Sequence, residues 1–226
     1  MIEIKKLTKN YGSKQVLDNI ELLFIKGNVY GIVGENGAGK TTLFRCMAGI
    51  ELYDGKIMYK NGQLKKVLGY LPTDLFFFPK MTAREYLQLL CNARQVTAPN
   101  FDEVNIFDLP LDQYADTYST GMKKKLALNA LLLQKNDVFI LDEPFNGVDI
   151  HSNILIKELI VKLKRLNKIV IISSHIFSTL NDTCDYLHLL KNGAIHKSVD
   201  KAHFSSIEED MKSSNILNKI DKLNIL

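Results

Sequence analysis

Short runs in which apolar and polar residues alternate open the chain. They lie at residues 2–4 (IEI) and 20–24 (IELLF), and the polar turn 9–13 comes between them. Alternation with a period of two is typical of strands that bury one face. We therefore expect antiparallel strands at the start of the chain.

Strands that are apolar on both faces come next, and they alternate with helical sequence. The first, at residues 29–33, leads into a glycine-rich loop and then into the helix-forming residues 41–48. Buried strands with helices between them are typical of a parallel α/β sheet, and a strand, a glycine loop and a helix together form a phosphate-binding unit. The alternation recurs downstream, with helical sequence at 122–134 and 153–167 and apolar runs at 138–141 and 169–173.

One segment, from about residue 74 to residue 121, interrupts this alternation. Residues 82–92 carry an apolar stripe at helical spacing, whereas residues 99–118 are mixed and rich in turn formers. We expect a helical insertion at about 74–121 within a domain that covers residues 1–205.

The tail, residues 206–226, is charged and rich in Asn and Ser. A helix of such composition is marginal unless its apolar face packs against something. We expect a helix that is stable only when docked, because the following apolar residues lie near helical spacing: Ile207, Met211, Ile216 and Ile220.

Composition narrows the class of protein. With 226 residues, 46% of them apolar, and a net charge of +4, the chain is typical of a soluble globular protein of one or two domains. The longest stretch without an acidic residue, Lys or Arg, residues 169–181, is too short to span a bilayer. The N-terminus lacks the features of a secretory signal, so we expect the protein to stay where it is made.

Cysteine and charge patterns argue against two kinds of site. Cys46, Cys91 and Cys184 have no metal-ligand spacing, which predicts free thiols in a reducing cytosol. A net charge of +4 is too small to indicate a nucleic-acid footprint, so no nucleic-acid partner is expected. We interpret the lysine run 123–125 as a solvated helix face.

The strongest chemical signal is residues 34–42 (GENGAGKTT), which fit the P-loop pattern of Gly, four residues, Gly-Lys-Ser/Thr. Glycines let the backbone curl so that successive N–H groups point inward, and the helix that opens at Lys40 presents its positive dipole end to the same phosphates. Lys40 would neutralise the β- and γ-phosphate oxygens, and the Thr41 hydroxyl would ligate Mg²⁺. The candidate phosphate-binding residues are Asn36, Gly37, Ala38, Gly39, Lys40, Thr41 and Thr42.

A second signal is residues 138–144 (VFILDEP), where an apolar strand ends in two acids. Such a pair alone is more often a turn, but here it accompanies a P-loop. A carboxylate at the carboxyl end of a parallel strand next to the P-loop strand is well placed to hold Mg²⁺, and the next residue can polarise water. Asp142 is therefore the candidate metal ligand and Glu143 the candidate base.

At this point the sequence resembles the ATP-binding-cassette (ABC) ATPases, over about residues 2–202. Residues 118–122 (YSTGM) stand where that family carries its signature sequence, 146–149 (NGVD) resemble its D-loop, and 173–175 (SSH) resemble its switch-histidine loop. The resemblance implies an α/β fold of the P-loop NTPase type, with a RecA-like parallel sheet core, an N-terminal antiparallel β subdomain and an inserted α-helical subdomain. It also implies ATP and Mg²⁺ as cofactors.

Further roles follow from the resemblance alone. Tyr11, with Val16 beyond it, matches the aromatic residue that stacks on adenine in the family, and His175 matches the switch histidine. Four other histidines match nothing in the family and are expected to be structural: His151, His188, His196 and His203.

The family also implies a partner cassette. Two such domains close head to tail, so each ATP would lie between one P-loop and the Ser119 and Gly121 face of the other. Ser119 and the helix start beside it could donate to the γ-phosphate, where negative charge spreads in the transition state. With Asp149 of the D-loop, these residues would make each chain hold two half-sites, in a homodimer or a heterodimer.

The sequence departs from the family at several positions. Thr73 stands where the family has a Gln that reaches Mg²⁺ and the attacking water, and a bridging water or Asp74 could substitute for that longer side chain. The signature has Tyr118, Thr120 and Met122 in place of Leu, Gly and Gln. The added Cβ at Thr120 predicts a less tight closed dimer, and we expect slow but real ATP hydrolysis.

Three consecutive phenylalanines follow at Phe76, Phe77 and Phe78. Neighbouring side chains cannot all face one core, so part of this run is expected to be exposed, and exposed apolar residues often mark partner sites. In the family, this region receives a cytoplasmic helix of a separate transmembrane subunit. These residues are a candidate docking element, with packing inside the insertion as the alternative.

The sequence favours one function class over two others. We expect an ATPase subunit that powers a membrane transporter, cytoplasmic and held at the inner face of the membrane by its transmembrane partner. Residues 119–126 are similar to those of bacterial exporter cassettes, which favours export. The alternatives are a soluble mechanical ATPase, whose relatives usually carry two cassettes or a long coiled-coil insertion, and a nucleotide-gated module that does not hydrolyse.

Overall fold

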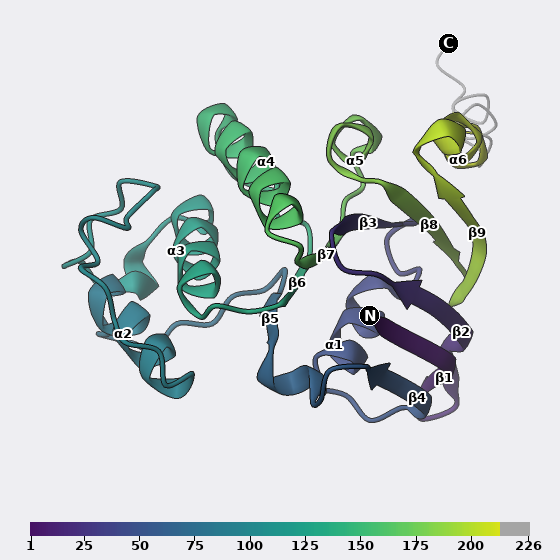
Figure 1. The fold of residues 1–226 in the computed structure, drawn as a ribbon, viewed down its shortest axis with the longest axis horizontal. Helices are drawn as coiled ribbons and strands as arrows, with labels where there is room; N and C mark the ends of the chain where they lie inside the picture. Colours follow the sequence, from purple (N-terminus) through teal and green to yellow (C-terminus); the bar gives the residue numbers. More distant parts are fainter. Residues whose placement is uncertain (213–226) are drawn as a thin grey trace, which may run out of the picture.

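The computed structural model of the chain describes residues 1–212 and has two sheets with helices around them (Figure 1). The predicted fold class is confirmed, because a mostly parallel sheet is combined with an antiparallel sheet near the N-terminus. None of the described helices is both long enough and apolar enough to cross a membrane.

The smaller sheet has three antiparallel strands in the order β2-β1-β4. The first two strands match the alternating pattern, and Ile2 pairs with both Phe24 and Tyr59 across the sheet. The third strand was not predicted, because its sequence DGKIMY buries only its last residue and alternates weakly. The bounds are Ile2–Tyr11 for β1, Lys14–Phe24 for β2 and Asp54–Tyr59 for β4.

The larger sheet has six strands in the order β5-β6-β7-β3-β8-β9, and only its β8–β9 pair is antiparallel. Our expectation that the strand before the acidic pair lies next to the P-loop strand is wrong, because β7 lies between β6 and β3. The bounds are Asn28–Val33 (β3), Leu68–Leu71 (β5), Val138–Leu141 (β6), Ile169–Ser173 (β7), Tyr186–Lys191 (β8) and Ala194–Asp200 (β9).

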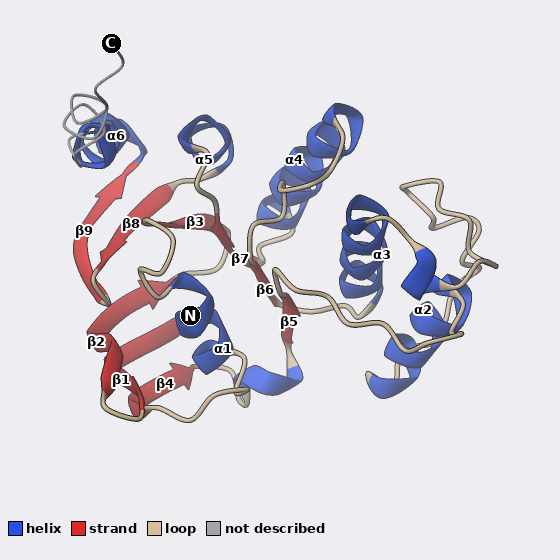
Figure 2. Cartoon of the chain, turned by 180° about the vertical axis from the view of Figure 1, so that it is seen from behind, coloured by secondary structure: helices blue, strands red, loops and turns tan. Residues whose placement is uncertain are grey.

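Two apolar cores form on opposite faces of this sheet, because neighbouring side chains on a strand point to opposite sides. Ile171 of β7 packs into a core with α1 and the antiparallel sheet, whereas Ile172 packs into a core with α3 and α4. Figure 2 shows these layers from behind. The helices are α1 (Lys40–Met47), α2 (Ala83–Ala93), α3 (Thr120–Leu133), α4 (Ile150–Arg165), α5 (Phe177–Thr183) and α6 (Phe204–Lys212).

The predicted insertion, residues 74–121, contains α2, the short 3₁₀ turn Ala115–Thr117 and otherwise irregular chain. A capping box fixes the start of α2, because the Thr82 hydroxyl accepts from the Glu85 N–H while the Glu85 carboxylate accepts from the Thr82 N–H. The irregular part is tied down by Arg84, which donates to Asp102 and Asp112. The division of the chain into these units stays a prediction.

Helix α6 lies at the start of the predicted tail. Phe204 and Ile207 are buried, and α6 packs against β8 and β9. Two residues of the predicted apolar stripe, Ile216 and Ile220, lie outside the described residues.

Candidate functional site

The loop after β3 takes a shape that requires glycine. Gly37 and Gly39 have φ of 84° and 110°. A Cβ on Gly39 would lie 2.8 Å from Leu17 Cδ2 and 3.0 Å from the Val16 carbonyl oxygen, so a larger residue does not fit there. Helix α1 begins directly afterwards without a side-chain cap, so the N–H groups of its first turn point toward the space above the loop.

Lys40 lies inside this loop. Its Nζ donates to the carbonyl oxygens of Gly34 at 2.7 Å and Glu35 at 3.1 Å, and the residue is only 8% exposed. Burial lowers the pKa of Lys40, while the nearby carboxylates of Glu143 and Asp142 act in the opposite direction. A cation is therefore held at the place where phosphate oxygens would meet the loop.

Two hydroxyl groups hold the acidic pair, and one of them, that of Thr41, links it to the phosphate loop. Asp142 Oδ2 accepts from Thr41 Oγ1 at 2.7 Å, and its Oδ1 accepts from Ser173 Oγ at 2.6 Å. The Ser173 oxygen also accepts from the Glu143 N–H at 2.8 Å. Ser173 is the last residue of β7, which lies between β3, the strand before the phosphate loop, and β6, the strand before the acidic pair. It belongs to the SSH segment noted in the sequence, but the sequence alone gave it no role.

Glu143 and His175, which lie far apart in the sequence, meet in the structure. Glu143 Oε2 lies 2.9 Å from His175 Nδ1. Glu143 also has a φ of 51°, in the left-handed region where residues with a Cβ are uncommon. This backbone conformation needs outside support, which comes from Ser173 on one side and from Lys124 on the other.

Lys124 corrects our interpretation of the lysine run as a solvated face. It is 3% exposed, and its Nζ donates to the carbonyl oxygens of Glu143 at 2.8 Å and Asn146 at 2.6 Å. Burial lowers the pKa of Lys124, and the carboxylates of Glu143 and Asp142 oppose this effect. The lysine run alone does not predict that Lys124 supports this loop, because the carbonyl oxygens that Lys124 binds belong to a different part of the chain.

These elements surround an open cleft of about 640 Å³. Tyr11 stands at its rim with 42% of its surface exposed. Ala38 lines the neighbouring cavity instead, and Thr73 and Asn146 line the cleft although they were not among the predicted site residues. The predicted residues that line the cleft are Tyr11, Val16, Asn36, Gly37, Gly39, Lys40, Thr41, Thr42, Asp142, Glu143 and His175.

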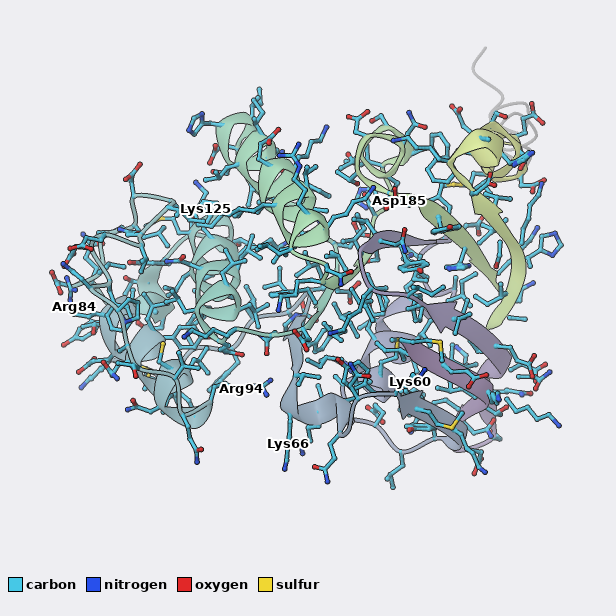
Figure 3. The ribbon with its side chains drawn as sticks, in the orientation of Figure 1. Lys60, Lys66, Arg84, Arg94, Lys125 and Asp185 are labelled. Carbon is cyan, nitrogen blue, oxygen red and sulfur yellow. The ribbon has the colours of Figure 1, made fainter. Side chains whose placement is uncertain are left out.

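Besides Ala38, three predicted residues do not line this cleft: Ser119, Gly121 and Asp149. Ser119 caps α3, its Oγ accepting from the Met122 N–H at 3.3 Å. Asp149 caps α4 and accepts from Nζ of Lys125 at 2.6 Å, so the Lys125 side chain reaches from α3 to the start of α4 (Figure 3). A Cβ on Gly121 would lie 2.6 Å from the Gly147 carbonyl oxygen, so the start of α3 packs directly on the loop 143–149.

A family model described as ABC transporter matches residues 17–146, from β2 through the P-loop to the acidic pair. The chain belongs to the ABC transporter family. As a cassette of this family it is an ATPase domain that binds ATP or ADP.

Two relatives are similar to this chain over most of its length. An ABC transporter ATP-binding protein of Methanocaldococcus jannaschii is 32% identical over 216 residues, which cover 92% of this chain and 78% of that protein. The Bacillus subtilis ABC transporter ATP-binding protein YhaQ is 28% identical, over 96% of this chain and 76% of YhaQ.

Solved structures share the fold. The structure of an ATP-binding subunit of an ABC transporter has a TM-score of 0.80 at 23% identity, covering 94% of this chain and 93% of that one. A dimeric cassette in a post-hydrolysis state bound to ADP and Pi has a TM-score of 0.79 at 19% identity, covering 89% and 99%.

The cassette has oxygen atoms suited to Mg²⁺. The Thr41 hydroxyl and the Asp142 carboxylate lie in hydrogen-bond contact beside the phosphate loop. Mg²⁺ is usually held by one or two such protein oxygens together with substrate phosphates and water. Within residues 1–212 no group of three or more His, Cys, Asp or Glu could hold a metal ion by itself. The residues present therefore fit a metal that arrives with the nucleotide.

Proposed function

We propose that the cassette binds and hydrolyses MgATP and that this powers a membrane transporter. The observation that carries the proposal is the continuous contact from Thr41 through Asp142 and Ser173 to Glu143 and His175, beside the buried Lys40. It puts a phosphate-binding loop, two metal-ligand oxygens and a supported carboxylate in one cleft.

Each of these groups has a chemical task in this proposal. Lys40 and the N–H groups of the loop bind the phosphates, and Thr41 and Asp142 would hold Mg²⁺, which would neutralise charge on the phosphate oxygens. Glu143 accepts a proton from the attacking water, and His175 holds the carboxylate of Glu143 in place. Tyr11 and Val16 contact the base.

A second cassette would complete the site. Ser119, Gly121 and Asp149 lie on a surface of this chain outside its own cleft, so in a head-to-tail pair they would meet the nucleotide of the partner. Ser119 caps a helix start, where N–H groups and the dipole attract a phosphate. Ile150 at 81% and Ile154 at 57% exposure lie beside Asp149 and would become buried on pairing.

A transmembrane subunit is the second proposed partner. Phe76 and Phe78 are 72% and 50% exposed and touch edge to face, whereas Phe77 is 6% exposed and packs against Tyr86. The docking element is therefore reduced to Phe76 and Phe78. Phe76 also lines a groove of about 500 Å³ between β5, α2 and α3, which could accept a helix of that subunit.

This docking is tested by copurification of the partner from membranes of the native host. The double substitution Phe76→Ser and Phe78→Ser is expected to abolish it, and Leu52→Ser, at a residue 89% exposed outside this groove, is the control. Undiminished copurification of the double variant would exclude this surface. Recovery of a polytopic protein with wild type would support a peripheral location at the inner face of the membrane, whereas ribosomal or DNA-associated proteins would favour a soluble mechanical ATPase.

Export, rather than import, is proposed from the similarity of residues 119–126 to exporter cassettes. ATP-dependent efflux or uptake in vesicles that contain the complete transporter would distinguish the two directions.

Hydrolysis is tested with Glu143→Gln. Loss of a general base typically lowers a rate by about 10²- to 10⁴-fold, so turnover should fall by that factor while MgATP still binds. ATP should then hold the variant as a dimer that wild type releases. Turnover equal in the two proteins, with the transmembrane partner present, would instead show a nucleotide-gated module that does not hydrolyse.

A further inference from the structure

An ion pair between a buried lysine and a partly exposed glutamate lies beside the aromatic ring at the rim of the cleft. Lys9 is 8% exposed, and its Nζ lies 3.0 Å from Glu51 Oε2. The same Nζ lies 4.5 Å from the centroid of the Tyr11 ring. Lys9 and Tyr11 both belong to β1, whereas Glu51 follows α1, so two separate elements meet at this ring.

The ring is held through Lys9. A cation over an aromatic face is attracted by the partial negative charge of that face, so Lys9 favours one orientation of the ring plane. The ion pair with Glu51 holds the Lys9 ammonium in place, and it lowers the pKa of Glu51. Through Lys9, Glu51 therefore also restricts the orientation of the Tyr11 ring.

The Tyr11 ring and Lys9 differ in their surroundings. Tyr11 lines the cleft and is 42% exposed, whereas Lys9 is buried and is not among the residues that line it. Lys9 thus lies over the ring without entering the cleft, and the exposed part of Tyr11 borders the cleft, where a planar group can stack.

We propose that Lys9 and Glu51 are positioning residues, which hold the Tyr11 ring in the plane that stacks on the base of the bound nucleotide. This rests on the proposed role of Tyr11 in base binding. A side chain that is already ordered loses less entropy on binding, and the typical saving for one side chain corresponds to about a 2- to 12-fold gain in affinity.

The test compares ATP with inorganic tripolyphosphate, which carries the phosphates without a base. Affinities are measured calorimetrically for wild type, Lys9→Met, Glu51→Gln and Tyr11→Ala, and for the double variant Lys9→Met with Tyr11→Ala. We expect Lys9→Met to weaken ATP binding about 2- to 12-fold and to leave tripolyphosphate binding unchanged. In the Tyr11→Ala background the same substitution should have no effect.

Lys5→Met is the matched control, because Lys5 also lies on β1 and pairs with an acid, Glu3, but is exposed and does not touch the ring. If Lys9→Met lowers the melting temperature too far for the binding measurement, Glu51→Gln is measured in its place. The positioning role would be overturned if Lys9→Met weakened the binding of ATP and of tripolyphosphate equally. It would also be overturned if Lys9→Met weakened ATP binding as much in the Tyr11→Ala background as in wild type. Wild type that binds no ATP would instead overturn the proposed function, and ATP binding unaffected by Tyr11→Ala would overturn base stacking.

Discussion

Ser173 is the residue on which the geometry of the acidic pair most depends. It is fully buried at the end of β7, donates to Asp142 Oδ1 at 2.6 Å and accepts from the Glu143 N–H at 2.8 Å. Ser173→Ala removes both bonds. The consequence should be visible in stability and in catalysis.

The size of the effect follows from the two bonds. A hydrogen bond to an ionised carboxylate contributes about 1.5–3 kcal/mol, and a buried N–H left without a partner costs about 1–3 kcal/mol. We therefore expect the free energy of unfolding to fall by about 2–5 kcal/mol. For a domain of this size, each kcal/mol lowers the melting temperature by about 2–4 °C, so the shift should be about 5–15 °C.

Ser174→Ala is a close control for this substitution. Ser174 is 1% exposed and adjacent in sequence, but its hydroxyl accepts from the Ile176 N–H, at 3.0 Å, and has no bond to the acidic pair. Loss of this neutral bond should lower the free energy of unfolding by about 1 kcal/mol. The two variants thus differ mainly in their link to the acidic pair.

Kinetics separate a local effect on the acids from general destabilisation. Ser173 does not line the cleft, but the displacement of the proposed base can lower kcat by about 10- to 100-fold. The assays are thermal unfolding and steady-state ATP hydrolysis well below the melting temperature. If Ser173→Ala and Ser174→Ala lost the same stability, or if Ser173→Ala kept full kcat, the proposed support of Asp142 and Glu143 by this hydroxyl would be refuted.

Two more predictions concern buried basic side chains, Lys124 and His188. Lys124→Met should lower the free energy of unfolding by about 2–5 kcal/mol in urea titrations, because two buried carbonyls lose their donor. Lys125→Met breaks an ion pair whose acid, Asp149, is 56% exposed, and it should cost less than about 1 kcal/mol. Equal losses in the two variants would contradict this. Burial lowers the pKa of His188 to about 4, so the unfolded chain binds more protons below its usual pKa of 6.5 and stability falls as pH falls through that range. Between pH 7 and pH 5 wild type should lose about 2 kcal/mol more than His188→Phe, and identical pH profiles in urea unfolding would contradict the assignment.

The features that the sequence predicted correctly are local. The P-loop joins a buried strand to a helix within 15 residues, 28–42, so its shape follows from its own glycines and the helix start. The alternating strands β1 and β2 are likewise adjacent in the chain. In each case the residues that determine the structure lie beside one another in the sequence.

The features that the sequence did not predict depend on contacts between distant segments. Strand order is one such feature, because the apolar runs do not show that β7 lies between β3 and β6. The contacts of Ser173 with the acidic pair depend on that order, so the sequence did not predict them. Lys124 was another, because its burial depends on the carbonyls of Glu143 and Asn146, which a different loop presents. Phe77 differs from Phe76 and Phe78 because Tyr86 of α2 covers only one of the three rings.

Contacts between α3 and the loop 143–149 join two parts of the chain that we propose to serve different nucleotides. The start of α3, which we propose to meet the nucleotide of a partner cassette, is fixed to the loop 143–149 at three points: Gly121 against the Gly147 carbonyl, Lys124 on two carbonyls, and Lys125 on Asp149. That loop begins with Glu143, the proposed base for the chain's own nucleotide. Because close-packed contacts resist stretching, a shift of α3 on pairing is expected to shift Glu143 as well. Such a shift would connect the partner's nucleotide to the proposed base of this chain.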